Sequence, residues 1–257
     1  MNAPRRSRTF YLVPAPSAAG LTSMAIGLVR ALQLQGLRAA YVKPIAQTGI
    51  RDEGQDRAAT FARLLVCPDT PESMAFEHAD ELVREGKMAS LMEEVIGLVE
   101  PLRHAYDVLI VEGLIPTAEI QIATRLNIAM INSLGADIIP VLAARGRPIE
   151  VLAERVATAI EQYSDDGRRS VAGVIINHCT DDVAAPLTLA GAIDLPRAQS
   201  AVPVIAATPT YPNLSSPRVK DVADRLGLTV YQAGDIAHQR VTENVVAARS
   251  CEKLISH

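Results

Sequence analysis

The chain has 257 residues, of which 49% are apolar and 21% are charged, enough for one substantial hydrophobic core. Its 25 basic and 29 acidic residues give a formal net charge of −4, which argues against a polyanion such as nucleic acid as a partner. No apolar run reaches the roughly 18 residues that span a bilayer, so no membrane partner is expected. The cysteines are widely spaced, at positions 67, 179 and 251, and fit a reducing cytoplasmic compartment.

Short apolar runs recur along the chain and alternate with segments of helical periodicity. They predict strands at residues 9–13, 38–42, 107–112, 137–143, 171–177 and 202–207. Most of these runs lack polar alternation, which is typical of parallel strands that are covered on both faces.

Between the strands, apolar residues return at helical spacing. Leu21, Met24, Leu28 and Leu32 predict a first helix that ends before Gly36. Further helices are predicted at residues 56–65, 91–102, 148–163 and 219–226. The alternation indicates right-handed crossovers and an α/β fold, a doubly wound, mostly parallel sheet with helices on both faces.

The stretch "LVPAPSAAGLTSM" joins the first strand to the first helix and has the outline of a phosphate-binding loop, G-x-x-x-x-G-K-[ST]. Ala15 stands at the first glycine of that pattern and Leu21 at its lysine, so a simple strand-to-helix turn remains an alternative. If an anion binds, the backbone N–H groups at a helix start are its expected holders. These would come from Ser17, Ala18, Ala19, Gly20 and Leu21.

Three polar residues stand at or near the carboxyl ends of separate predicted strands. Lys43 follows one strand, Glu112 ends another and Asn177 ends a third. Ligands of doubly wound sheets bind at this edge, so these residues and Thr22 of the loop are candidates for one site. Lys43 and Glu112 could equally form a structural ion pair, and Asn177 could cap a turn.

Taken together, "KPIAQTG", "VEGLIPT", "VAGVIIN" and the loop resemble the dethiobiotin synthetase fold, a P-loop branch of ATP-using enzymes. The resemblance implies that Lys43 contacts a substrate and its carbamate and that Asn177 lies on the adenine side. It also implies a Mg²⁺ ion bound by Thr22, Asp56 and Glu112, whose oxygens suit a hard cation.

The segments "LTSMAIGLVRALQLQGLRAAYVKPIAQ", "LMEEVI" and "VEGLIPT" more closely resemble the amino-terminal domain of long-form phosphate acetyltransferases. In that family G-L-T-S replaces G-K-T, so Leu21 is a family feature. The tail "GDIAHQRV" to "ARSCEKLISH" resembles the start of the DRTGG-type middle domain. The expected domains are therefore residues 1–227, and 228–257 as a truncated middle domain or a carboxy-terminal tail.

This resemblance implies a regulatory and assembly module without catalytic residues of its own. Its expected partners are the carboxy-terminal acetyltransferase domain, a small anionic effector and further copies of the chain. No cofactor is expected beyond Mg²⁺ with a weakly bound nucleotide, because Leu21 cannot donate a hydrogen bond to a phosphate. The alternatives are an ATP- and Mg²⁺-dependent ligase of the dethiobiotin synthetase type and a pure interaction domain.

Overall fold

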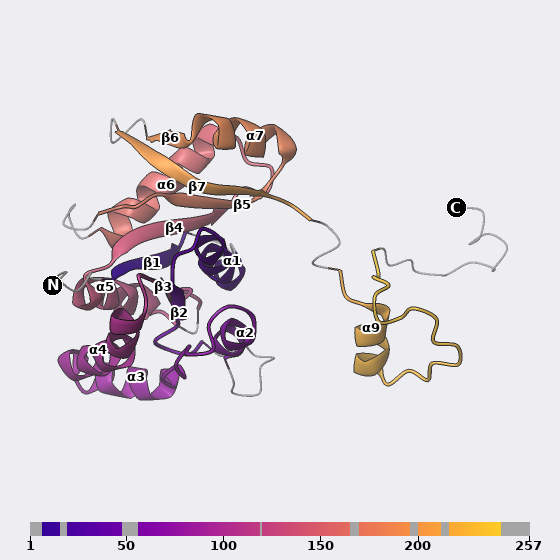
Figure 1. Cartoon of the computed structure of the whole chain (residues 1–257), viewed down its shortest axis with the longest axis horizontal. Helices are drawn as coiled ribbons and strands as arrows, with labels where there is room; N and C mark the ends of the chain where they lie inside the picture. The colour runs from indigo at the N-terminus through magenta and orange to yellow at the C-terminus, as the bar shows by residue number, and fades with distance from the viewer. Residues whose placement is uncertain are drawn as a thin grey trace. The chain divides into compact units, whose positions relative to one another are not determined.

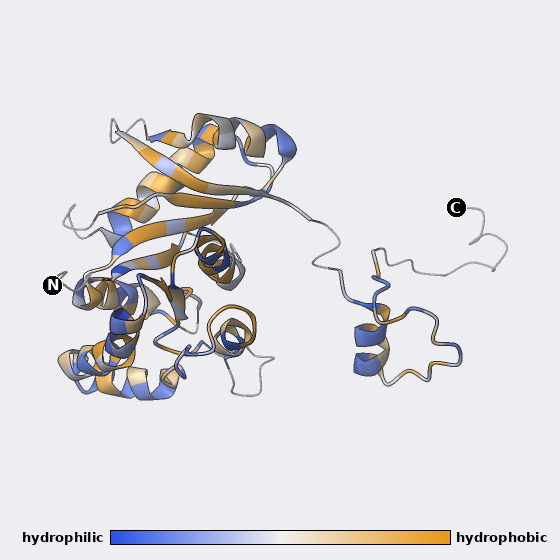
Figure 2. Cartoon of the chain, in the orientation of Figure 1, coloured by the Kyte–Doolittle hydropathy of each residue, from blue (hydrophilic) through white to orange (hydrophobic). Residues whose placement is uncertain are grey.

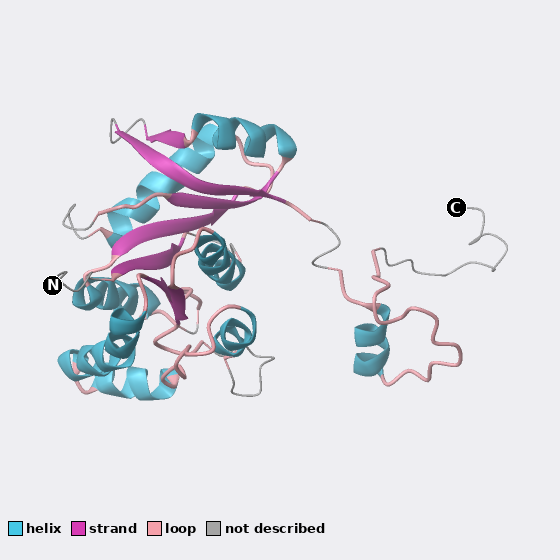
Figure 3. Cartoon of the chain, in the orientation of Figure 1, coloured by secondary structure: helices cyan, strands magenta, loops and turns pink. Residues whose placement is uncertain are grey.

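The structure, a computed structural model, describes residues 7–15, 20–47, 56–118, 120–164, 170–195, 200–211 and 216–242 (Figure 1). The chain divides into two compact units, Met1–Pro209 and Thr210–His257. The first unit is built of alternating strands and helices (Figure 3). It holds every residue that the sequence singles out as a site candidate.

The described residues of the first unit form one seven-stranded sheet with the order β2-β3-β1-β4-β5-β7-β6. All neighbouring strands pair in parallel except β6 and β7, which are antiparallel. This arrangement confirms the predicted doubly wound, mostly parallel α/β sheet. The strands are β1 (Arg8–Pro14), β2 (Ala39–Val42), β3 (Val108–Glu112), β4 (Asp137–Ala143), β5 (Val174–Cys179), β6 (Ala192–Leu195) and β7 (Ser200–Pro209).

Helices cover both faces of the sheet, with α1 and α2 on one side and α3, α4 and α5 on the other (Figure 1). The sequence predicts α1, α2, α4 and α6, but not α3, α5 and α7. The helices of this unit are α1 (Leu21–Leu34), α2 (Arg57–Leu65), α3 (Phe76–Arg84), α4 (Met88–Ala105), α5 (Ala123–Leu134), α6 (Ile149–Tyr163) and α7 (Asp181–Ala190). No helix among the described residues is both long and apolar enough to cross a membrane.

Successive residues of the central strands point to opposite faces of the sheet, as the period of a strand requires. Tyr11 and Val111 pack in the core beneath α4 and α5, whereas Leu12, Tyr41 and Ile110 pack in the core beneath α1. The strands are accordingly apolar along most of their length (Figure 2). Because the sheet is buried on both sides, a charged side chain can approach it only near the strand ends.

The second unit contains helix α9 (Val219–Leu226), which the sequence predicts with the same bounds. Arg218 precedes it and forms an antiparallel bridge with Arg240. The predicted domain boundary after residue 227 stays a prediction, and the compact units separate earlier, after Pro209. Most of the tail that resembles a middle domain, residues 243–257, lies outside the described residues.

Candidate functional site

Four of the predicted site residues come together at the carboxyl ends of β2 and β3. Lys43 directly follows β2, and Glu112 is the last residue of β3. Glu112 lies two residues after Ile110, so it points to the face of the sheet that α1 covers. Thr22 is the second residue of α1, and Asp56 is the N-cap residue of α2.

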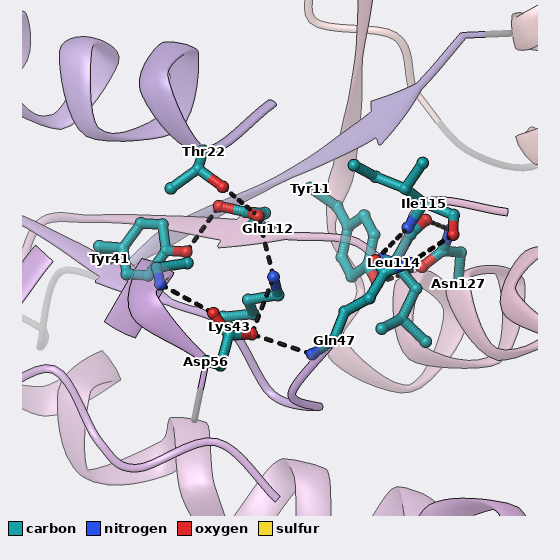
Figure 4. A network of polar contacts seen from close by, with 11 residues as sticks. Tyr11, Thr22, Tyr41, Lys43, Gln47, Asp56, Glu112, Leu114, Ile115 and Asn127 are labelled. Atoms are coloured by element: carbon teal, nitrogen blue, oxygen red, sulfur yellow. Dashed lines mark hydrogen bonds and ion pairs between the residues drawn. The ribbon is translucent and has the colours of Figure 1, made fainter. Parts of the chain in front are cut away.

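The side chains of these residues form one buried polar cluster (Figure 4). The ammonium Nζ of Lys43 lies 2.9 Å from Oδ2 of Asp56 and 3.2 Å from Oε1 of Glu112. Thr22 donates its hydroxyl to Oε1 of Glu112 at 2.8 Å, and Tyr41 donates its hydroxyl to Oε2 at 2.6 Å. Both carboxylate oxygens of Glu112 thus accept hydrogen bonds or ion-pair contacts from the chain itself.

Burial and the neighbouring negative charges shift the pKa of Lys43 in opposite directions. Burial lowers the pKa of the Lys43 ammonium, but the negative charges of Glu112 and Asp56 more than offset that effect and raise the pKa above its ordinary value. Burial also raises the pKa of the Tyr41 hydroxyl, and the neighbouring Glu112 charge raises it further. Lys43 is therefore charged at neutral pH, and Tyr41 is a neutral hydrogen-bond donor.

Gln47 connects the cluster to the loop that follows β3. Its backbone N–H donates to Oδ2 of Asp56 at 2.9 Å. Its side-chain amide donates to the carbonyl of Ile115 at 2.7 Å and accepts from the backbone N–H of Ile115 at 2.8 Å. This two-way pairing fixes the loop after β3 against the segment that carries Lys43.

Asn127 of α5 holds the same loop from the other face of the sheet (Figure 4). Its Oδ1 accepts hydrogen bonds from the Tyr11 hydroxyl at 2.9 Å and from the backbone N–H of Leu114 at 2.8 Å. Its Nδ2 donates to the carbonyl of Leu114 at 2.8 Å. Asn127 is fully buried, so these bonds replace those that water would otherwise make with it.

The described end of the phosphate-loop-like segment lies against β5. Gly20 has φ 72° and ψ 41°, a left-handed conformation, and a Cβ there would lie 2.9 Å from Nδ2 of Asn177. Asn177 also accepts a hydrogen bond from the hydroxyl of Thr208 at 2.7 Å. Ser17, Ala18 and Ala19 of this loop lie outside the described residues.

Leu21 occupies the position of the phosphate-binding lysine, and its side chain belongs to the hydrophobic core. It is 1% exposed and packs in the same cluster as Leu12, Ala25 and Val29. The first residue of α1 is thus an apolar packing residue of the core.

The two carboxylates of the cluster share one cation of the chain itself, the Lys43 ammonium. Asp56 and Glu112 are the acidic ligands that the resemblance implies, and the Lys43 ammonium contacts both of them. No group of three or more His, Cys, Asp or Glu residues in the described part of the chain could hold a metal ion.

Tyr41, Gln47 and Asn127 were not among the predicted site residues. The role of Tyr41 had a readable signal, because residues two apart in a strand share a face and Tyr41 precedes Lys43 by two. Gln47 lies within the motif "KPIAQTG", but its partner is a backbone group almost seventy residues away. Asn127 interrupts an apolar helical pattern, which is a signal for a satisfied buried amide.

Comparison with known proteins relates the chain to one family and to part of a group of longer enzymes. An AAA domain family matches residues 8–218. The phosphate acetyltransferase of Pseudomonas putida is 31% identical over 95% of this chain and 35% of its own length. That of Deinococcus radiodurans is 32% identical over 96% of this chain and 35% of its own length. The chain therefore spans about a third of the length of these relatives.

The relatives confirm the resemblance to part of a long phosphate acetyltransferase. Among solved structures, an ATP complex of a variant of McdA from Cyanothece has a TM-score of 0.47 and 13% identity. The match covers 91% of this chain and 93% of the McdA chain. The family match includes the whole parallel sheet and all four residues of the polar cluster, and the chain belongs to the AAA domain family.

Proposed function

We propose that the chain is the amino-terminal regulatory and assembly module of a phosphate acetyltransferase, with a nucleotide loop that has lost its phosphate-binding lysine. The observation that carries this proposal is the packing of Leu21 in the core at the lysine position. Phosphoryl transfer depends on positioning and charge neutralisation, and an isobutyl group contributes neither to a bound phosphate. The similarity to about a third of each longer enzyme supports a separate catalytic domain.

In this proposal the module works in the cytoplasm, associates with further copies of itself and contacts the carboxy-terminal acetyltransferase domain. A small anionic metabolite is its proposed effector, held by the backbone N–H groups at the start of α1, with Lys43 and Asn177 nearby. An anion that uses Lys43 would take the third N–H donor of an ammonium that already contacts Asp56 and Glu112.

A second candidate function is an ATP- and Mg²⁺-dependent ligase of the dethiobiotin synthetase type. The observation that favours it is the close approach of Thr22, Lys43, Asp56 and Glu112, which the ligase would use together. For this chemistry Mg²⁺ would have to replace the Lys43 ammonium between the two carboxylates.

The purified chain alone is expected to form no acetyl-CoA from acetyl phosphate and CoA, because the proposal assigns that chemistry to another domain. The measurement is a spectrophotometric assay of acetyl-CoA, with a complete phosphate acetyltransferase as the positive control. Turnover that is proportional to the concentration of this chain and comparable to the control would overturn the assignment of catalysis to another domain.

A further inference from the structure

We propose that the Lys43 ammonium is the resident cation of the Asp56–Glu112 carboxylate pair and that it excludes divalent cations from that pair. The inference concerns the cluster itself and holds whether or not the chain regulates an acetyltransferase. It rests on the position of one atom, Nζ of Lys43, between two carboxylates that are far apart in the sequence.

The three charged side chains lie close together and are buried. Nζ is 2.9 Å from Asp56 and 3.2 Å from Glu112, and the three side chains are 7%, 7% and 1% exposed for Lys43, Asp56 and Glu112. Water cannot screen these charges well, so each carboxylate needs a positive partner within the protein. Lys43 meets that need for both of them.

The Lys43 ammonium neutralises only one of the two carboxylate charges. One ammonium and two carboxylates sum to +1 − 2 = −1, so the cluster keeps a net negative charge. A divalent cation that entered beside Lys43 would be attracted by the carboxylates but repelled by an ammonium a few ångströms away. A divalent ion doubles its attraction to the carboxylates as well as its repulsion from the ammonium, so the ammonium acts by reducing the net charge that the ion meets from −2 for the two carboxylates alone to −1.

Donors other than Lys43 also hold the two carboxylates. Asp56 accepts from the backbone N–H groups of Ala58 at 2.7 Å and Gln47 at 2.9 Å. Glu112 accepts from the hydroxyls of Thr22 and Tyr41. These donors hold both carboxylates in place, so removal of the ammonium alone would leave a preformed set of oxygen ligands of the kind that hard cations prefer.

The test is a Mn²⁺ titration followed by the electron paramagnetic resonance signal of free Mn²⁺. Lys43→Met removes the charge and keeps an unbranched side chain of similar length. We expect this variant to bind Mn²⁺ at least about a hundredfold more tightly than the unmutated chain. Lys43→Gln keeps a hydrogen-bond donor toward the carboxylates and gives the same comparison if the methionine variant does not fold.

Two further variants serve as matched controls. Lys43→Arg keeps a positive charge in the cluster and is expected to bind Mn²⁺ as weakly as the unmutated chain. Lys87→Met removes an exposed ammonium that lies 2.7 Å from Glu85, and it is expected to have no effect on Mn²⁺ binding. The proposal is overturned if the unmutated chain binds Mn²⁺ as tightly as the folded neutral variant, whether both bind strongly or neither does. Neither result bears on acetyl-CoA formation, which tests the proposed function separately.

Discussion

Replacement of Glu112 with alanine is expected to lower the free energy of unfolding by about 2 to 4 kcal/mol. The substitution removes the acceptor of the buried Tyr41 hydroxyl and one of the two counterions of Lys43, and it leaves a cavity at the end of β3. Lys43 keeps Asp56 as a partner, so the loss comes mainly from hydrogen bonding and packing. Chemical denaturation of the two chains measures the difference.

Glu85→Ala is the matched control for this substitution. Glu85 also forms an ion pair with a lysine, Lys87, at 2.7 Å, but both side chains are about half exposed. Exposed pairs of this kind contribute little, so the control is expected to change stability by less than about 1 kcal/mol. Equal small losses for Glu112→Ala and Glu85→Ala would contradict the central place of Glu112 in the buried cluster.

Replacement of Gly113 with alanine is expected to cost about 2 to 3 kcal/mol, because the position after β3 has no room for a side chain. A Cβ there would lie 2.7 Å from Cε1 of Tyr11, 2.9 Å from the carbonyl oxygen of Leu12 and 3.0 Å from Oδ1 of Asn127. The carbonyl belongs to β1, so the clash can be relieved only by movement of backbone at the centre of the sheet. Thermal or chemical denaturation measures the loss.

Gly97→Ala provides a control with the opposite expected sign. Gly97 lies inside α4, and a Cβ there would meet nothing within 4 Å. Alanine in a helix interior is more favourable than glycine by roughly 0.5 to 1 kcal/mol, so this variant is expected to be more stable than the unmutated chain. If Gly113→Ala were equally stabilising, the close packing of the loop after β3 against β1 would be wrong.

The central strands were predictable from sequence because they are continuous apolar runs bounded by polar residues. β4 has the predicted bounds, β1 is longer than predicted by one residue at each end, and β3 begins one residue later than predicted. The strand predicted from residue 171 begins at Val174, although Val171 already forms a parallel bridge with Ile138 and the backbone N–H of Ala172 donates to the carbonyl of Ile138. Gly173, whose φ is 156°, lies between this bridge and the first residue of β5.

The missed elements had different causes. β6 spans only Ala192–Leu195 and pairs antiparallel with β7 at the edge of the sheet, so its apolar pattern is too short to recognise. In α5, Leu126, Met130 and Leu134 recur at intervals of four and face the core, which is a helical signal in the sequence.

The candidate site was predictable in part for a topological reason. The carboxyl ends of parallel strands meet at one edge of a sheet, so Lys43 and Glu112 could be expected to lie close together. The exact partners could not be read from sequence, because the position of Lys43 between Asp56 and Glu112 depends on how α2 packs against the sheet. Leu21 belongs to the apolar helical pattern of the first helix, and its burial in the core agrees with that pattern.

The most direct test of the proposed loss of nucleotide binding is a calorimetric titration of the unmutated chain with ATP and Mg²⁺. The unmutated chain is the one to measure, because Leu21→Lys would also remove a core side chain that is 1% exposed. Loss of one charge-assisted hydrogen bond, worth about 1.5 to 3 kcal/mol, weakens binding by roughly one to two decades. We therefore expect weak binding or none, and micromolar binding of ATP with Mg²⁺ would contradict the loss of nucleotide binding and favour the ligase.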